Sequence, residues 1–273
     1  MRKPAGSGKL AGKVALVTGG GGGIGGAICD LFGREGAKVA VADLDLAAAK
    51  RSVARIMRTG GKAIPVGVDV SDPAQAARAV AEAVRVFKGL DVLVNCAALR
   101  PSPIGNVVEQ GFEEWRRTFA VNVTGPFLMC KHAIPHLKRG KGPSIINIAS
   151  QLGQRGIARR AGYGASKAAL IHFTAGLALD FAEDGIRANS ISPGAVLTRQ
   201  LAGNYGSAAA AEARLGPMHL FGRLGRPEEI AAGALFLASD DCPFMNGANL
   251  LIDGGYISFK GVTRAKPRKV RGG

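Results

Sequence analysis

The chain has 273 residues, 47% of them hydrophobic, which is enough for one large α/β domain with a substantial core. Its net charge is +16, from 36 Lys and Arg against 20 Asp and Glu. There is no run of about 18 apolar residues and no apolar leader after Met1, so we expect a cytoplasmic protein without a membrane span. The four cysteines (Cys29, Cys96, Cys130 and Cys242) lack metal-ligand spacing, and we expect reduced thiols and no metal site.

The first half of the chain alternates short apolar runs with segments of helical periodicity. Residues 13–18 (KVALVT) predict a buried strand, which a glycine-rich loop connects to a helix ending near Gly36. Further strands are predicted at 38–42, 63–68 and 91–95. Helices are predicted between them, one reaching about Arg58 and the next over 73–87.

The second half continues this alternation. The predicted helices cover 112–137, 165–182 and 227–237, the predicted strands cover 144–148, 186–191 and 249–252, and residues 194–222 are irregular with some helix. Because the strands are continuous apolar runs separated by helices, they are typical of a parallel sheet covered on both faces. We predict one α/β domain over residues 1–259, followed by a basic tail over residues 260–273.

The tail holds six lysines and arginines and no acidic residue. Such a segment can bind nucleic acid or another anionic partner, or it can be solvated or cross to another subunit. It has no aromatic residue to stack on bases, so nucleic-acid binding is unlikely on this pattern and the solvated alternative is favoured.

The loop after the first strand, TGGGGGIG from Thr18 to Gly25, has the composition of a phosphate-binding turn. Glycines let backbone amides approach a pyrophosphate, and the following helix adds the positive end of its dipole. Asp43 ends the second predicted strand, where a carboxylate accepts both ribose hydroxyls of NAD and repels the extra phosphate of NADP. Neither Gly20–Gly22 nor Leu44 supplies a basic side chain, which favours NAD; the alternative for Asp43 is a helix N-cap.

A tyrosine and a lysine four residues apart, Tyr163 and Lys167, share one face of a predicted helix. The lysine ammonium should lower the pKa of the phenol and make proton exchange possible near neutral pH. Ser150 follows a predicted strand and can orient a substrate oxygen, with a strand-end cap as its alternative. Asn122 lies on the long predicted helix and can anchor a water, with a buried structural amide as its alternative.

Together these motifs resemble the classical short-chain dehydrogenase/reductase family, from about Leu10 to Tyr256. The glycine loop looks like the family's T-G-x-x-x-G-x-G, and the four polar residues match its Asn, Ser, Tyr and Lys in order. Asn95-Cys96-Ala97-Ala98 is similar to the family's N-N-A-G, with Cys96 and Ala98 as departures. Asp253-Gly254-Gly255 matches its closing D-G-G. The cofactor contacts implied are Thr18, Gly19, Gly23, Ile24, Gly25, Asp43, Leu44, Asp69, Val70, Asn95, Ala97, Tyr163, Lys167, Pro193, Gly194, Val196 and Thr198.

The resemblance implies a Rossmann-like, doubly wound, mostly parallel sheet of about seven strands, in a homotetramer or homodimer. It also implies an NAD-dependent oxidoreductase that transfers hydride between nicotinamide and a secondary alcohol or ketone. Tyr163 would be the acid/base, Ser150 would hold the oxygen, Lys167 would tune Tyr163 and hold the ribose, and Asn122 would complete the proton relay.

The substrate stays open among sugars, polyols, hydroxy acids, oxoacyl compounds and steroids. We expect specificity to lie in residues 151–160, which include Gln151, Arg155, Arg159 and Arg160, and in residues 199–221, a mobile lid in which His219 is expected at the surface. Two other functions remain: a family member that binds NAD as a sensor or scaffold, and a binder of anionic partners through the basic tail.

Overall fold

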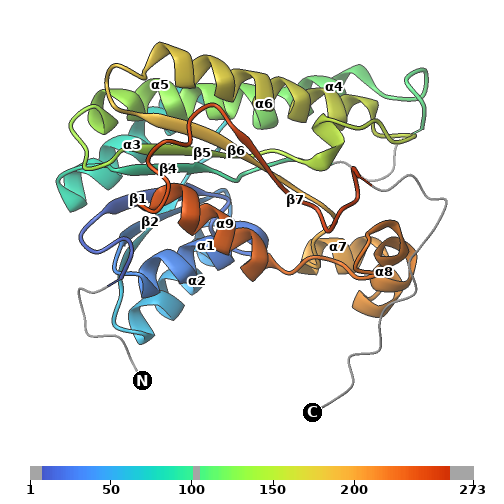
Figure 1. The fold of residues 1–273 in the computed structure, drawn as a ribbon, viewed down its shortest axis with the longest axis horizontal. Helices are drawn as coiled ribbons and strands as arrows, with labels where there is room; N and C mark the ends of the chain where they lie inside the picture. Colours follow the sequence, from blue (N-terminus) through green and yellow to red (C-terminus); the bar gives the residue numbers. More distant parts are fainter. Residues whose placement is uncertain (1–7, 101–104, 259–273) are drawn as a thin grey trace.

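A seven-stranded sheet organises the part of the chain that the computed structural model describes, residues 8–100 and 105–258 (Figure 1). The strand order is β3-β2-β1-β4-β5-β6-β7, and every neighbouring pair is parallel. The predicted Rossmann-like α/β fold is confirmed. The predicted basic tail, residues 260–273, lies outside the described residues. The strands are β1 (Val14–Thr18), β2 (Lys38–Asp43), β3 (Lys62–Gly67), β4 (Val92–Asn95), β5 (Ser144–Ile148), β6 (Arg187–Pro193) and β7 (Asn249–Ile252).

The central strands are apolar on both faces because helices cover both faces. In β1, Leu16 packs into one hydrophobic cluster, while Ala15 and Val17 pack into the other, and all three side chains are fully buried. This explains why the strand sequences lack the alternation of polar and apolar residues that a half-exposed sheet shows.

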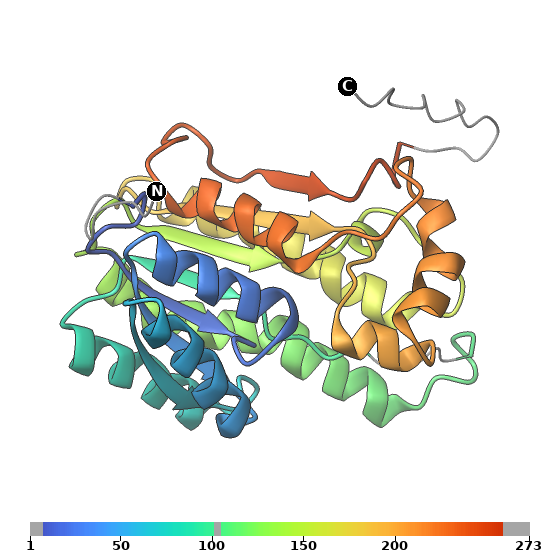
Figure 2. The ribbon, with the colours of Figure 1, turned by 90° about the horizontal axis from the view of Figure 1, so that it is seen from below.

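Two layers of helices sandwich the sheet, as Figures 1 and 2 show. On one face, α1, α2 and α9 bury apolar side chains such as Phe32, Ile56 and Ile230; on the other, α3, α5 and α6 bury side chains such as Val80 and Met129. The helices are α1 (Gly23–Arg34), α2 (Leu46–Arg58), α3 (Pro73–Phe87), α4 (Phe112–Phe119), α5 (Gly125–Leu137), α6 (Ala161–Asp180), α7 (Arg199–Asn204), α8 (Ala208–Leu215) and α9 (Pro227–Ala238).

The long helix predicted over residues 112–137 is interrupted by a π-helical turn. Between α4 and α5, the segment Ala120–Thr124 adopts this wider turn, and Asn122 lies at its centre. Side-chain periodicity did not reveal it, since a single i→i+5 turn adds only about one residue to the helical repeat. Such turns often occur where a helix presents a residue to a functional site.

Two other sequence expectations differ in detail from the structure. Helix α6 begins at Ala161 rather than at Ala165, so Tyr163 lies in its first turn. The irregular segment after β6 contains the short helices α7 and α8, drawn in orange in Figure 2 beyond the carboxyl ends of the strands. His219 follows them and is only 2% exposed, so the expectation of a surface histidine is wrong.

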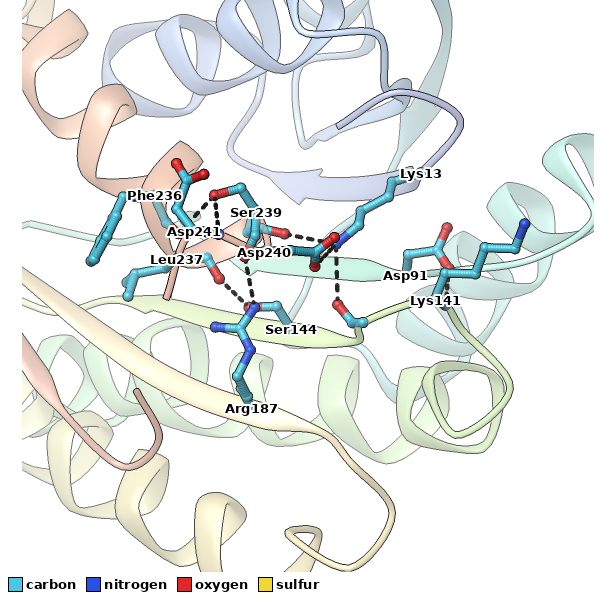
Figure 3. A network of polar contacts seen from close by, with 12 residues as sticks. Lys13, Asp91, Lys141, Ser144, Arg187, Phe236, Leu237, Ser239, Asp240 and Asp241 are labelled. Atoms are coloured by element: carbon cyan, nitrogen blue, oxygen red, sulfur yellow. Dashed lines mark hydrogen bonds and ion pairs between the residues drawn. The ribbon is translucent and has the colours of Figure 1, made fainter. Parts of the chain in front are cut away.

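A polar network closes the opposite end of the sheet, where the strands begin (Figure 3). The Nζ of Lys13 donates to the Asp240 carboxylate at 2.8 Å and to the Ala238 carbonyl at 3.2 Å. Arg187, the first residue of β6, donates to the Ser239 carbonyl at 3.1 Å. These contacts join the end of α9 to β6 and to the entrance of β1, and they leave the carboxyl ends of the strands to form a site.

Candidate active site

A cavity of about 870 Å³ opens at the carboxyl ends of the strands. Most of the predicted site residues line it, although they come from segments far apart in the chain. Of the predicted set, Thr18, Asn95 and Asn122 do not line the cavity. Those that do are Gly19, Gly23, Ile24, Gly25, Asp43, Leu44, Asp69, Val70, Ala97, Ser150, Tyr163, Lys167, Pro193, Gly194, Val196 and Thr198.

The glycine loop is packed too closely for side chains. A Cβ on Gly25 would lie 2.2 Å from the Gly19 carbonyl oxygen, and one on Gly19 would lie 2.9 Å from the Ala97 Cα. Gly22 precedes α1 and supplies no capping side chain. The first amides of α1 therefore have no side-chain acceptor at this cap, and a pyrophosphate fits their charge and geometry.

Asp43 is placed at the cavity wall by a hydrogen bond on each carboxylate oxygen. Its Oδ2 accepts from the Gly21 amide at 2.8 Å, and its Oδ1 accepts from the Asp45 amide at 2.9 Å. The N-cap of α2 is Asp45, so the capping role that the sequence left open as the alternative for Asp43 is filled by Asp45 instead. The Leu44 side chain is 72% exposed and brings no positive charge.

Thr18 and Asn95 support the wall from behind. The Thr18 hydroxyl accepts from the amides of Cys96 and Ala97 at 3.0 and 3.2 Å. Asn95 donates to the Asn147 side chain at 2.8 Å. Both residues are buried, and they fix the strand end that carries Ala97 instead of facing the cavity themselves.

Asn122 is also fully committed to protein partners. Its Oδ1 accepts from the Leu99 amide at 2.8 Å, and its Nδ2 donates to the Leu99 carbonyl and to Ser166 Oγ, both at 3.0 Å. The π-helical turn thus ties the segment after β4 to the first turns of α6. The expected role of Asn122 in anchoring a water stays a prediction.

Ser150, Tyr163 and Lys167 meet on one side of the cavity. Lys167 Nζ donates to the Ile148 carbonyl at 2.8 Å and lies 5.9 Å from the centroid of the Tyr163 ring. Ser150 also caps the turn after β5, because its Oγ accepts from the Leu152 amide at 3.1 Å. The capping role and the position at the cavity are therefore compatible.

Burial dominates the proton equilibria of this group. It raises the pKa of Tyr163 above its ordinary value, while the Arg100 charge and a hydrogen bond with Ser150 act in the opposite direction. Burial also lowers the pKa of Lys167 to about 8. The expectation that the lysine brings the phenol pKa down is not met in the protein without a cofactor, since desolvation of the phenolate outweighs the nearby positive charges.

The sequence did not single out several residues that line the cavity. Arg100 comes directly after the segment at the end of β4, and Arg117 lies on α4. The position of Arg100 after a strand end was a usable signal. Arg117 lies one helical turn before Val121, another lining residue, and nothing in the sequence marked this face of the helix as part of a site. Cys96 also lines the cavity, and burial raises the pKa of its thiol to about 12, so it is protonated at neutral pH.

His219 connects the helices beyond the cavity to its floor. Its Nε2 accepts from the Ala195 amide at 3.1 Å, and its Nδ1 is 3.0 Å from the Leu215 carbonyl. A Cβ on Gly194 would lie 2.9 Å from the same Nε2. The segment after β6 is thus held to α8 by a buried histidine, and the sequence offered no signal for it.

No helix within residues 8–100 and 105–258 is long and apolar enough to cross a membrane. Over the same residues, no group of three or more His, Cys, Asp or Glu side chains is placed to hold a metal ion.

Comparisons with known proteins identify the family. A family model described as enoyl-(acyl carrier protein) reductase matches residues 19–257. The chain is 42% identical to a 2,5-dichloro-2,5-cyclohexadiene-1,4-diol dehydrogenase of Sphingobium indicum, covering 91% of this chain and 97% of that protein. It is 36% identical to a cyclohexanol dehydrogenase of an Acinetobacter species, covering 92% and 98%. A short-chain type dehydrogenase/reductase from Mycobacterium marinum superposes with a TM-score of 0.84 at 34% identity, covering 90% and 96%. The chain belongs to the short-chain dehydrogenase/reductase family.

Proposed function

We propose that this protein is an NAD-dependent dehydrogenase of secondary alcohols. The observation that carries the proposal is the presence of Ser150, Tyr163 and Lys167 in the same cavity as a glycine loop at a helix N-terminus. Two relatives are dehydrogenases of a cyclic diol and of cyclohexanol, so cyclic secondary alcohols are the first substrates to examine.

The protein's own residues supply orientation and proton transfer. NAD, when bound, accepts the hydride from the alcohol carbon. Ser150 holds the substrate oxygen, and Tyr163 removes its proton as the carbonyl forms. Lys167 is fixed by the Ile148 carbonyl beside the tyrosine ring, where its positive charge would act against the burial that disfavours the phenolate. Asn122 is a positioning residue, which holds Leu99 and Ser166 in place by hydrogen bonds.

The preference for NAD over NADP rests on Asp43. Its carboxylate is held at the cavity by two backbone amides, where it suits ribose hydroxyls and opposes a 2′-phosphate. Thr18 and Asn95 support this cofactor site from behind its wall rather than by direct contact.

We propose that residues 1–259 act as one catalytic domain, with residues 260–273 as a separate basic tail, in a cytoplasmic homotetramer or homodimer. Analytical ultracentrifugation of the full chain tests the assembly, and the same measurement on a chain ending at residue 259 tests whether the tail takes part.

The deciding experiment is NADH formation by the purified protein with cyclohexanol, cyclopentanol and open-chain secondary alcohols, with NADP in parallel. Tyr163→Phe keeps the ring and removes the proton acceptor, so we expect at least about 100-fold lower turnover. Turnover that survives Tyr163→Phe would contradict the assigned chemistry. Tight NAD binding with no turnover of any alcohol or ketone would favour a sensor instead, and a preference for NADP would contradict the role of Asp43.

A further inference from the structure

Charge is unevenly distributed around the cavity. The acidic residues of the wall are Asp43 and Asp69, at and just beyond the ends of β2 and β3. On the other side of β1, the wall near Tyr163 carries Arg100, whose charge acts on that tyrosine, and Arg117 of α4 also lines the cavity. The half of the cavity that faces the reactive tyrosine is therefore positive, and the half that faces the predicted ribose site is negative.

The two arginines form no ion pair with a described carboxylate, although Glu114 precedes Arg117 by three residues on α4. The adjacent Arg116, by contrast, pairs with Glu113 at 2.6 Å. Arg100 is half-buried, so its charge is only partly screened by solvent. A half-buried guanidinium (Arg100) and an exposed one (Arg117) that line one cavity without an ion-pair partner favour an anionic ligand.

The cofactor does not account for this pair. The adenosine half of a dinucleotide belongs at β2 and β3, on the other side of β1 from Arg100. A third lining arginine, Arg199, follows Thr198, and a Cβ on Gly23 would lie 3.4 Å from the methyl group of that threonine. Arg199 therefore stands near the glycine loop and suits a pyrophosphate, which leaves Arg100 and Arg117 for the substrate.

A third polar group lies in the same half of the cavity. Gln151, next to Ser150, lines the cavity and is 6% exposed, and its Oε1 has no hydrogen-bond partner among the described residues. A buried amide without a partner is costly unless a ligand supplies one. Since an amide can present either its oxygen or its NH₂ group, Gln151 can bind a polar group of a substrate held at Ser150.

We propose that the substrate is a secondary alcohol bearing a carboxylate, which Arg100 and Arg117 bind while its hydroxyl lies against Ser150 and Tyr163. The inference rests on the dehydrogenase function proposed above and narrows its substrate class to hydroxy acids. Apolar lining residues such as Leu99, Val121 and Leu152 fit the carbon skeleton between the two ends.

The test compares each hydroxy acid with its neutral amide. The probes are 3-hydroxycyclohexanecarboxylate and 3-hydroxybutyrate, each against the corresponding carboxamide, with NAD as the second substrate. For the wild type we expect kcat/KM to favour the carboxylate by about tenfold or more, because a charge-assisted hydrogen bond adds that much binding over a neutral one. Equal or better use of the amides would overturn the proposal.

Arg100→Gln and Arg117→Gln locate the effect. Each should lower the carboxylate-to-amide ratio of kcat/KM by about three- to tenfold, towards equal use of the two substrates, mainly through KM. The ratio is the readout because Arg100 also acts on the pKa of Tyr163, which changes the rate for both members of a pair alike. Arg155→Gln is the matched control, since this exposed arginine does not line the cavity, and it should leave the ratio unchanged. Arginine variants that lower both rates equally would overturn the proposal.

A binding measurement separates this inference from the proposed function. Calorimetric titration of the NAD complex with cyclohexanecarboxylate and with cyclohexanecarboxamide needs no turnover. Carboxylate-selective binding that Arg100→Gln abolishes supports the anion site even if no alcohol is oxidised, in which case only the proposed activity fails. Absence of any preference for the carboxylate, in a protein that does oxidise neutral alcohols, overturns the anion site and leaves the activity intact.

Discussion

Lys167 is a charged residue almost wholly removed from water, with 2% of its surface exposed. Its Nζ donates to the Ile148 carbonyl at 2.8 Å. Burial lowers the pKa of this amine to about 8, from an ordinary value of 10.5. The folded protein without cofactor therefore gives up this proton at a lower pH than the unfolded chain does.

The stability of the protein should reflect this difference. Between pH 8 and 10.5 the unfolded chain binds more protons at Lys167, so the free energy of unfolding rises with pH across this window. Lys167→Met removes the effect. We expect the wild type to gain on the order of 3 kcal/mol relative to Lys167→Met between pH 7 and 10.5, measured by urea unfolding without cofactor. Parallel curves for the two proteins would show that Lys167 titrates normally.

The residues that carry chemistry were open to prediction from the sequence to different degrees. Tyr163, Lys167 and Asp43 stood in recognisable patterns, and the structure brings all three to one cavity. Arg117 stood in none, because an arginine beside a cavity looks the same in sequence as one in solvent, and the signal for Arg100 was only its place after a strand end. The sequence instead pointed to residues 151–160 as determinants of specificity, and Arg155 in that segment is exposed.

At the scale of helices and strands, periodicity located the elements but not their local distortions. The π-helical turn around Asn122 and the early start of α6 depend on contacts with Leu99 and Ser166, which come from other parts of the chain. Such tertiary contacts leave no local signal. Two glycines in helices illustrate this, because they look alike in sequence but have different packing around them.

Gly176 in α6 and Gly125 at the start of α5 should respond oppositely to alanine. A Cβ on Gly176 would meet nothing within 4 Å, so Gly176→Ala should stabilise the protein by about 0.5–1 kcal/mol through reduced freedom of the unfolded chain. A Cβ on Gly125 would lie 2.7 Å from Val70 Cγ2, and Gly125→Ala should cost about 1–3 kcal/mol. Denaturant unfolding of both variants measures this; equal shifts would contradict the packing of α5 against the segment after β3.

At the scale of the whole molecule, the two ends of the sheet have different tasks. The carboxyl ends form the cavity, and the amino ends are closed by the network around Lys13 and Arg187 (Figure 3). From the sequence, the alternation of elements predicted a parallel sheet and the resemblance implied a doubly wound one of about seven strands, but the strand order was not predicted. The amino-end network was not predicted, since Lys13 and Arg187 are both distant in the chain from Ser239 and Asp240.

Lys13→Met should weaken the whole fold without touching the cavity. It removes the hydrogen bonds to Asp240 and to the Ala238 carbonyl, and we expect a loss of about 1–3 kcal/mol in the free energy of unfolding. Lys9→Met is the control, because Lys9 pairs with Asp241 in solvent and should matter little. The Michaelis constant for NAD should stay unchanged in both. A Lys13 variant as stable as the Lys9 variant would show that the network contributes nothing.

The strand order also bears on the sequence of events during folding. Strands β1, β2 and β3 are neighbours in both the chain and the sheet, whereas β1 reaches its other neighbour only when Ala15 pairs with Val92. Closing short loops costs less entropy than closing long ones, so we expect β1 to β3 to assemble early. A newly made chain would then shape its nucleotide loop and Asp43 before Tyr163 and Lys167 find their places, and a bound dinucleotide could serve as a template for the later half.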